Sequence, residues 1–315
     1  MASYQVIDTH TAGHPTRAIL GGLPPVRGES VLARRDDFRQ RLDHLRPQLL
    51  HEPRGHAAMV GAILTESSQA DFGAFFISSY VYLDMCGHAT IGLARTLVAS
   101  GQVVLGEEAT SFTLETPAGI VTVAVSRAQD GAITASIRNV PARLEVPAMT
   151  VDVEGLGSIG LQIATCGGRF ALVDAAALDL AIEPDRAGEL CRKAAAIKAA
   201  VNAQLPEPAG SVLFYRDLGH GRAQHMVVLE THKFDRSPCG TGTSARMAAL
   251  HAAGVLEVGE RFIAEGILGT RYVCAIEETT QDGVIPRIAG EAFLSAYATL
   301  IVEDADPLAA GFLCR

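Results

Sequence analysis

The sequence contains no tryptophan, no excess of basic residues and no long apolar run. The missing tryptophan excludes nothing by itself. The charge balance does exclude some classes of partner, because the chain has 26 Lys and Arg but 35 Asp and Glu, for a net charge of −9. Nucleic acid and anionic membrane surfaces attract clustered Lys and Arg, so we expect neither as a partner. No apolar run reaches the roughly 18 residues that a membrane-spanning helix needs.

Cysteines are few and widely spaced. The six cysteines form no CxxC pair and stand at positions 86, 166, 191, 239, 274 and 314 of 315 residues. Such spacing is typical of reduced cytosolic thiols rather than of a disulfide framework. The first residues also lack the basic stretch and apolar stretch of a secretory signal. These patterns predict a cytoplasmic protein.

What the sequence does contain is an internal repeat. An offset of 153 residues (239 minus 86) places Cys86-Gly87 on Cys239-Gly240. Further identities at this offset are Thr90/Thr243, Leu97/Leu250, Ala99/Ala252 and Gly101/Gly254. A match at a fixed period indicates two structurally similar halves. We predict one domain over residues 1–140 with Cys86 and a second over 141–315 with Cys239, and we allow the last strand, about 292–315, to return to the first domain.

Both repeated segments have the pattern of a buried helix. Asp84 and Ser237 are favoured N-caps, which would put each cysteine at the second helical position. Gly101 and Gly254 are suited to ending the helices. The intervening turns are rich in Ala and Leu on all sides, which favours burial. Two more helices are expected at about 36–48 and 185–204, and strands are expected at 80–83, 121–125, 133–137 and 226–229. Each half is therefore predicted to be a curved sheet around one central helix.

The two cysteines suggest a chemistry. A helix N-terminus lowers the pKa of a thiol and offers N–H groups to a carboxylate. Two such ends that converge across a cleft would hold a carboxylate with a thiolate on one side of its α-carbon and a thiol on the other. One sulfur would remove the α-proton and the other would deliver a proton to the opposite face, which inverts the centre. A structural disulfide between Cys86 and Cys239 is a rival that a reducing compartment disfavours. A zinc site with Cys86 and His88 has too few ligands in the pattern, so no metal site is predicted.

At these residues the chain resembles the proline racemase family over essentially its whole length. The resemblance rests on the segments Ile7-Asp-Thr-His-Thr-Ala-Gly-His-Pro-Thr-Arg17, Glu52-Pro-Arg-Gly-His56, Met85-Cys-Gly-His88, Glu115-Thr-Pro-Ala-Gly119 and Asp235-Arg-Ser-Pro-Cys-Gly-Thr-Gly-Thr243. His10, His14 and His56 lie in these motifs and are assigned no chemistry.

The resemblance implies an α/β (α+β) fold in which two pseudo-symmetric domains each form a mostly antiparallel sheet barrel around a central helix. It implies an active site between the domains and a reaction without pyridoxal phosphate, metal or any other cofactor. By resemblance, Cys86 and Cys239 are the catalytic acid and base. The residues that would hold the substrate carboxylate are Gly87, His88, Gly240 and Thr241. Asp235 would bind the ring nitrogen of an imino acid substrate.

Substrate choice depends on the pocket wall. Proline-specific relatives tend to carry Phe at the positions of Val60 and Leu229, so the aliphatic residues here favour 4-hydroxyproline. Ser211 is a further candidate wall residue, and Gly266 departs from the Glu-Ser-Ile pattern often found there. The expected reaction is epimerisation of trans-4-hydroxy-L-proline to cis-4-hydroxy-D-proline, with proline racemisation as the alternative.

Other functions are disfavoured by the same residues. Dehydratases of trans-3-hydroxy-L-proline typically lose one of the two cysteines. A non-catalytic amino-acid-binding protein would need neither thiol, and a thiol-redox enzyme is disfavoured by the absence of CxxC. The sequence leaves the oligomeric state open, and a homodimer is compatible with it.

Overall fold

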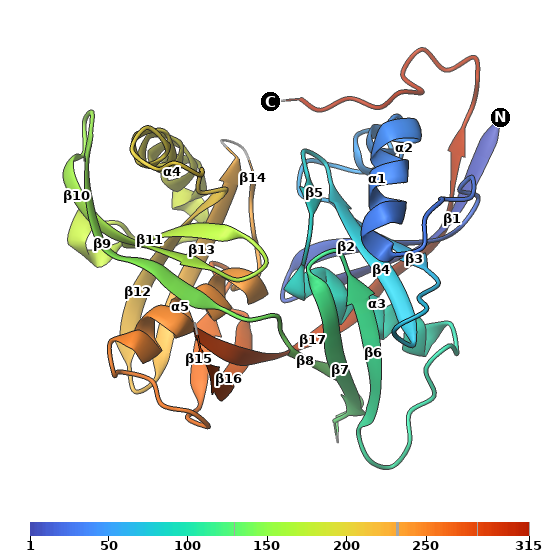
Figure 1. Ribbon diagram of the computed structural model, residues 1–315. Coiled ribbons are helices and arrows are strands. Elements are labelled where there is room, and N and C mark those ends of the chain that lie inside the picture. The colour runs from blue at the N-terminus through green and yellow to red at the C-terminus, as the bar shows by residue number, and fades with distance from the viewer. Residues whose placement is uncertain (129, 231–232, 282, 315) are drawn as a thin grey trace. The chain divides into compact units, whose positions relative to one another are not determined.

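A computed structural model describes residues 1–128, 130–230, 233–281 and 283–314. The chain divides into two compact units, which Figure 1 shows in ribbon form. Unit 1 comprises Met1–Ile137 and Gly290–Arg315, and unit 2 comprises Arg138–Ala289. The long strand β17 (Gly283–Val302) starts in unit 2 and ends in unit 1. The last segment of the chain therefore belongs to the first unit.

The described residues of unit 1 form three helices and a set of paired strands. Its elements before β17 are β1 (Ala2–Thr11), β2 (His14–Gly21), α1 (Val31–Arg41), α2 (Leu45–Leu50), β3 (Val60–Thr65), β4 (Phe72–Ser78), β5 (Tyr82–Leu83), α3 (Gly87–Ala99), β6 (Thr110–Thr116), β7 (Gly119–Arg127) and β8 (Ile133–Arg138). Strands β1–β2, β3–β4 and β6–β7 pair antiparallel, whereas β2–β3 and β4–β6 pair parallel. β17 pairs antiparallel with β1.

Unit 2 repeats this plan. Its elements are β9 (Arg143–Val153), β10 (Gly157–Thr165), β11 (Arg169–Asp174), two short 3₁₀ turns at 176–178 and 184–186, α4 (Ala187–Asn202), β12 (Ser211–Gly219), β13 (Arg222–Glu230), β14 (Lys233–Phe234), α5 (Gly240–Ala252), β15 (Phe262–Glu265) and β16 (Arg271–Thr280). Strands β10–β11, β12–β13 and β15–β16 pair antiparallel, and β11–β12 and β13–β15 pair parallel.

The two units thus share one order of pairings, strand for strand. Each is a mostly antiparallel sheet curled into a barrel around one helix. α3 packs on β1, β2 and β3, and α5 packs on β9, β10 and β11. The predicted fold class, two similar halves with a mostly antiparallel sheet around a central helix, is confirmed.

Both central helices are buried along nearly their whole length. Gly101 and Gly254 end them with positive φ values of 76° and 69°. In each case the residue after the glycine, Gln102 or Val255, donates its N–H to the carbonyl five positions earlier, at 2.9 Å. This is the Schellman ending, which needs a left-handed residue that glycine adopts without steric cost. The predicted glycine ends are confirmed.

Separate apolar clusters join the remaining helices to the sheets. In unit 1, Phe38 of α1 and Leu49 of α2 pack with Phe75 of β4. In unit 2, Ile197 of α4 packs with Phe214 of β12. In place of the helix expected at 36–48 the structure has two helices, α1 and α2. The first begins earlier, at Val31, because the Ser30 side chain accepts a hydrogen bond from the Ala33 N–H and caps it.

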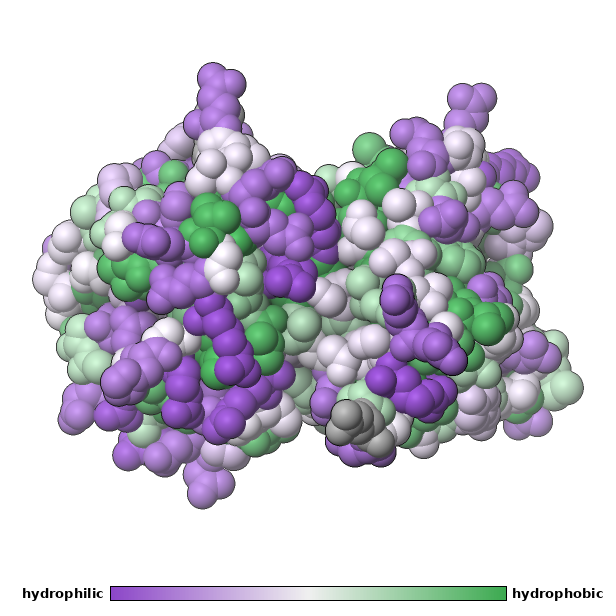
Figure 2. Space-filling model, turned by 90° about the horizontal axis from the view of Figure 1, so that it is seen from below, coloured by the Kyte–Doolittle hydropathy of each residue, from purple (hydrophilic) through white to green (hydrophobic). Residues whose placement is uncertain are grey.

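Figure 2 shows hydrophilic side chains interspersed with apolar ones over the face seen from below. Among the described residues, no helix is both long and apolar enough to cross a membrane.

Candidate functional site

Helix α3 begins two residues later than its sequence predicts. Cys86 itself is the N-cap, with an extended backbone (φ −145°, ψ 103°), and Asp84 is not the cap. The Asp84 carboxylate instead pairs with Arg35 at 2.5 Å, which draws it to the surface. Cys86 is 6% exposed and Gly87 is buried. The first N–H groups of a helix have no intrahelical partner, so Cys86 stands beside a set of backbone donors.

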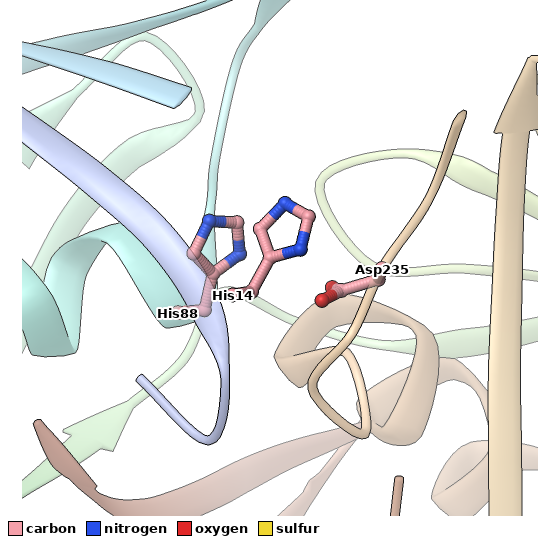
Figure 3. A group of neighbouring side chains, drawn as sticks. All are labelled: His14, His88 and Asp235. Carbon is pink, nitrogen blue, oxygen red and sulfur yellow. The ribbon is translucent and has the colours of Figure 1, made fainter. Parts of the chain in front are cut away.

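His88 packs against the cysteine from the first turn of the same helix. Its Nδ1 lies 3.4 Å from the Cys86 Sγ, and its carbonyl accepts a hydrogen bond of 2.8 Å from the Thr11 hydroxyl. The ring of His14 meets that of His88 edge to face, with centroids 4.3 Å apart, and Figure 3 shows the two rings side by side. Sequence reasoning assigned Thr11 and His14 no role, although both lie in the first family motif.

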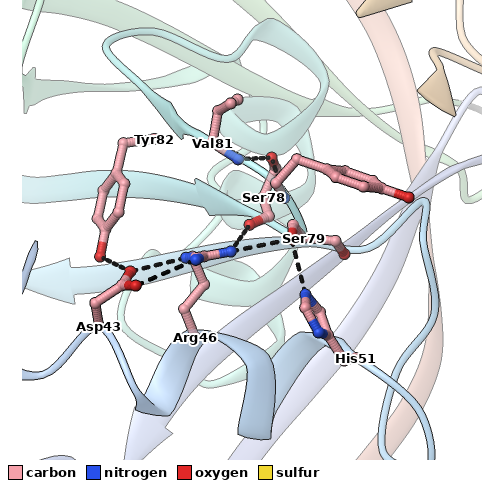
Figure 4. A network of polar contacts seen from close by, with 8 residues as sticks. Asp43, Arg46, His51, Ser78, Ser79, Val81 and Tyr82 are labelled. Atoms are coloured by element: carbon pink, nitrogen blue, oxygen red, sulfur yellow. Dashed lines mark hydrogen bonds and ion pairs between the residues drawn. The ribbon is translucent and has the colours of Figure 1, made fainter. Parts of the chain in front are cut away.

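A polar network holds the turn that leads toward Cys86. Figure 4 shows Arg46 of α2 between the Asp43 carboxylate, at 2.8 Å, and the Ser79 carbonyl, at 3.0 Å. The Tyr82 hydroxyl donates to the same carboxylate at 2.6 Å. These bonds tie strand β5 to α2 directly before the cysteine segment.

Helix α5 begins in the corresponding way, at a cysteine N-cap. Cys239 is 8% exposed, and its Sγ accepts a hydrogen bond from the Gly242 N–H at 3.4 Å. The Thr241 hydroxyl lies 3.7 Å from the same sulfur. A Cβ at Gly242 would lie 3.2 Å from this sulfur and 2.9 Å from Val227, so only glycine fits without displacement. The prediction that Ser237 caps α5 is therefore wrong, as is the prediction that Asp84 caps α3.

Ser237 and Asp235 form the approach to this cysteine. The Ser237 hydroxyl donates to the Asp235 carboxylate at 2.7 Å and accepts from the Cys239 N–H at 3.2 Å. The Ser237 N–H donates to the same carboxylate at 2.9 Å. Asp235 is 4% exposed and directly follows β14; Figure 3 shows its carboxylate. A Cβ on Gly266 would lie 3.0 Å from the backbone of this loop, so Gly266 lets the two segments approach closely.

The three candidate wall residues lie on strands of the two units. Val60 is the first residue of β3 and is 1% exposed, and Ser211 opens β12 at 6% exposed. Leu229 of β13 is partly exposed and lines a small hollow beside α4. Its carbonyl accepts a hydrogen bond of 2.7 Å from Lys198 of that helix.

Within unit 1 the fold therefore brings Cys86, Gly87 and His88 together. Within unit 2 it groups the predicted catalytic and substrate-binding residues Asp235, Cys239, Gly240 and Thr241.

The other buried cysteines stand in a different environment. Burial raises the pKa of the Cys166 thiol to about 12, and it also raises those of Cys191 and Cys274. Desolvation disfavours the thiolate, so these three side chains remain protonated at neutral pH. None of the three begins a helix.

Comparison with known proteins assigns the chain to a family. The model of the family described as proline racemase matches residues 6–313. A proline racemase from Clostridioides difficile is 37% identical, covering 99% of this chain and 98% of its own. A 4-hydroxyproline 2-epimerase from Streptosporangium roseum is 39% identical, covering 98% of each.

A solved structure agrees with these sequences. The crystal structure of a hydroxyproline epimerase from Agrobacterium vitis, with bound trans-4-hydroxy-L-proline, superimposes with a TM-score of 0.93 at 26% identity. The match covers 100% of this chain and 95% of that one. The chain belongs to the proline racemase family and is an isomerase of the racemase and epimerase type.

Proposed function

We propose that the chain is a cofactor-independent 4-hydroxyproline 2-epimerase that interconverts trans-4-hydroxy-L-proline and cis-4-hydroxy-D-proline with Cys86 and Cys239. The observation that carries the proposal is the matched pair of buried cysteine N-caps, each followed by glycine, on the central helices of two like-folded units. A single reactive cysteine would need no such duplication. A two-base inversion uses one group on each face of the carbon.

In the proposed reaction one sulfur is a thiolate and the other a thiol. The thiolate takes the α-proton, and the electron pair of the broken C–H bond moves toward the carboxylate. The thiol then gives its proton to the opposite face of the carbon, so the product forms and the two sulfurs exchange protonation states. The mechanism requires both sulfurs within about 3–3.5 Å of the α-carbon.

The remaining site residues would bind rather than transfer protons. We propose that the N–H groups of Gly87, His88, Gly240 and Thr241 hold the carboxylate and stabilise the charge that grows on it as the proton leaves. Asp235 would pair with the ring nitrogen of the imino acid. A cytoplasmic location would keep both thiols reduced.

Proline racemisation is the second candidate, because relatives of both names have similar identity to this chain. The preference for 4-hydroxyproline rests on the aliphatic Val60 and Leu229, which would leave room for a 4-hydroxyl. The test is a parallel assay by chiral chromatography with L-proline, trans-4-hydroxy-L-proline and trans-3-hydroxy-L-proline. A higher kcat/KM for the 4-hydroxylated substrate is expected. A higher value for L-proline would establish the racemase instead, and formation of a dehydrated product would contradict both.

A further inference from the structure

The two cysteine N-caps differ in their backbone. Cys86 is extended, whereas Cys239 has φ 64° and ψ 107°. A side chain at positive φ is strained, and this ψ lies outside the small left-handed well where the strain is least. Such a residue persists only where its surroundings hold it, and it is found mostly at functional sites. The conformation of Cys239 therefore needs a structural cause.

The cause is a pair of hydrogen bonds that fix the peptide group between Pro238 and Cys239. On one side, the Pro238 carbonyl accepts a hydrogen bond of 3.0 Å from the Thr243 hydroxyl. On the other side, the Cys239 N–H donates to Ser237. Since both polar atoms of this group are bound, its plane cannot turn, and the plane sets φ of Cys239.

The Thr243 hydroxyl is itself in contact with a histidine, His225. His225 of β13 is 0% exposed, and its Nδ1 lies 3.0 Å from the Thr243 Oγ1. The threonine proton is already directed at the Pro238 carbonyl, so the hydroxyl accepts from the ring and Nδ1 carries the hydrogen. The other ring nitrogen, Nε2, has no hydrogen-bond partner among the described residues. Burial, with a smaller contribution from Arg246, lowers the pKa of His225 to about 3 against the opposing effect of a hydrogen bond with the Pro238 backbone, so the ring is neutral.

We propose that His225 and Thr243 are positioning residues, a relay that holds Cys239 in its positive-φ conformation and so aims its sulfur. The order of donors is His225 Nδ1–H to Thr243 Oγ1, then Thr243 O–H to the Pro238 carbonyl. The catalytic part of this inference rests on the proposed function of Cys239, but the relay itself rests on unit 2 alone.

Unit 1 supplies a natural control. Thr90 occupies the position that corresponds to Thr243 (243 minus 153), but its hydroxyl donates to the carbonyl of Cys86 itself, at 2.9 Å. That bond lies within the helix and does not hold the peptide group before the cysteine. Cys86 has no positive φ to maintain. Removing the Thr90 hydroxyl should therefore affect Cys86 much less than removing the Thr243 hydroxyl affects Cys239.

The experiment measures the rates at which iodoacetamide alkylates Cys239 and Cys86 in the full chain, by peptide mapping, together with kcat and KM. Thr243→Val and His225→Phe remove the two donors. Thr243→Ser keeps the hydroxyl, and His225→Asn places an amide N–H near the position of Nδ1. Thr90→Val is the matched control, and Ile197→Val, on the buried face of α4, controls for loss of stability.

We expect Thr243→Val and His225→Phe to slow alkylation of Cys239 relative to Cys86 by about tenfold or more, since small misplacements of a reacting group carry large rate costs. kcat should fall by a similar factor, and KM should stay within about twofold of the wild-type value. The reason is that these variants change the position of the reacting sulfur and leave the substrate-binding groups in place. Thr243→Ser and His225→Asn should restore both. Equal losses in Thr90→Val or Ile197→Val, or no rescue by Ser and Asn, would overturn the relay. Full activity of Cys239→Ser would instead refute the proposed function, while the alkylation result would still decide the relay.

Discussion

Ser237 offers a sharp test of the Cys239 approach, because one hydroxyl joins two buried groups. Ser237→Ala removes the donor to the Asp235 carboxylate and the acceptor for the Cys239 N–H. A lost hydrogen bond to a charged group costs about 1.5–3 kcal/mol, and a buried N–H without a partner costs about 1–3 kcal/mol. Since Ser237 is 0% exposed, water cannot replace the hydroxyl without rearrangement. We therefore expect a loss of about 3–5 kcal/mol in the free energy of unfolding.

The assay is urea denaturation followed by circular dichroism, with epimerase kinetics beside it. A matched control is Ser136→Ala, because the Ser136 hydroxyl has no hydrogen-bond partner among the described residues. Its removal should not destabilise the protein, because it breaks no hydrogen bond. kcat/KM of Ser237→Ala should fall at least about tenfold, since both Asp235 and Cys239 lose a support. If Ser237→Ala behaves like Ser136→Ala, the hydroxyl does not organise this loop.

Three further predictions follow from the same features. Iodoacetamide near pH 8 should label Cys86 and Cys239 well before Cys166 and Cys274, with protection of the first pair by substrate, because burial raises the pKa of the other two thiols; equally rapid labelling of Cys166 in peptide maps would contradict this. The double change Val60→Phe with Leu229→Phe should lower kcat/KM for trans-4-hydroxy-L-proline by at least about tenfold and spare L-proline, since an apolar pocket discriminates a small group by about 1–3 kcal/mol; equal loss for both substrates would refute the pocket argument. His225 has a folded pKa of about 3, below the unfolded value of 6.5, so the unfolded chain takes up its proton first and stability falls as pH drops from about 6.5 toward 3. Urea titrations should show that His225→Asn lacks this pH-dependent part of the free energy of unfolding, which is worth up to about 1.4 kcal/mol per pH unit over that window. Parallel stability profiles for the wild type and His225→Asn would exclude a contribution from His225.

Much of the fold could be predicted from the sequence, because the repeat is strong and its helices are apolar on all sides. The glycine ends at Gly101 and Gly254 were predictable, since only a left-handed residue completes that hydrogen-bond pattern. The N-terminal ends were not, because Asp84 and Ser237 are good caps by residue type alone. The partner of Asp84 is Arg35, a tertiary contact that residue type does not reveal. Ser237 instead donates to Asp235, two residues earlier, so neither side chain caps its helix.

The site shows the same limit. Cys86, Cys239 and their following glycines could be identified because the motif occurs twice. His225 and Thr243 could not be singled out as a pair, since 18 residues separate them and only the packing of α5 on the sheet places them in contact. The positive φ of Cys239 has no sequence signal either, because cysteine gives no sign of that conformation.

The central claim is that two thiols invert one carbon, and heavy water tests it most directly. In deuterium oxide, the wild-type protein should convert trans-4-hydroxy-L-proline into cis-4-hydroxy-D-proline that carries deuterium at the α-carbon, because the delivering thiol exchanges with solvent. Mass spectrometry of the separated epimers measures both conversion and label. Cys86→Ser and Cys239→Ser should each abolish net inversion. Product without solvent deuterium, or full inversion by either single variant, would contradict the two-thiol mechanism.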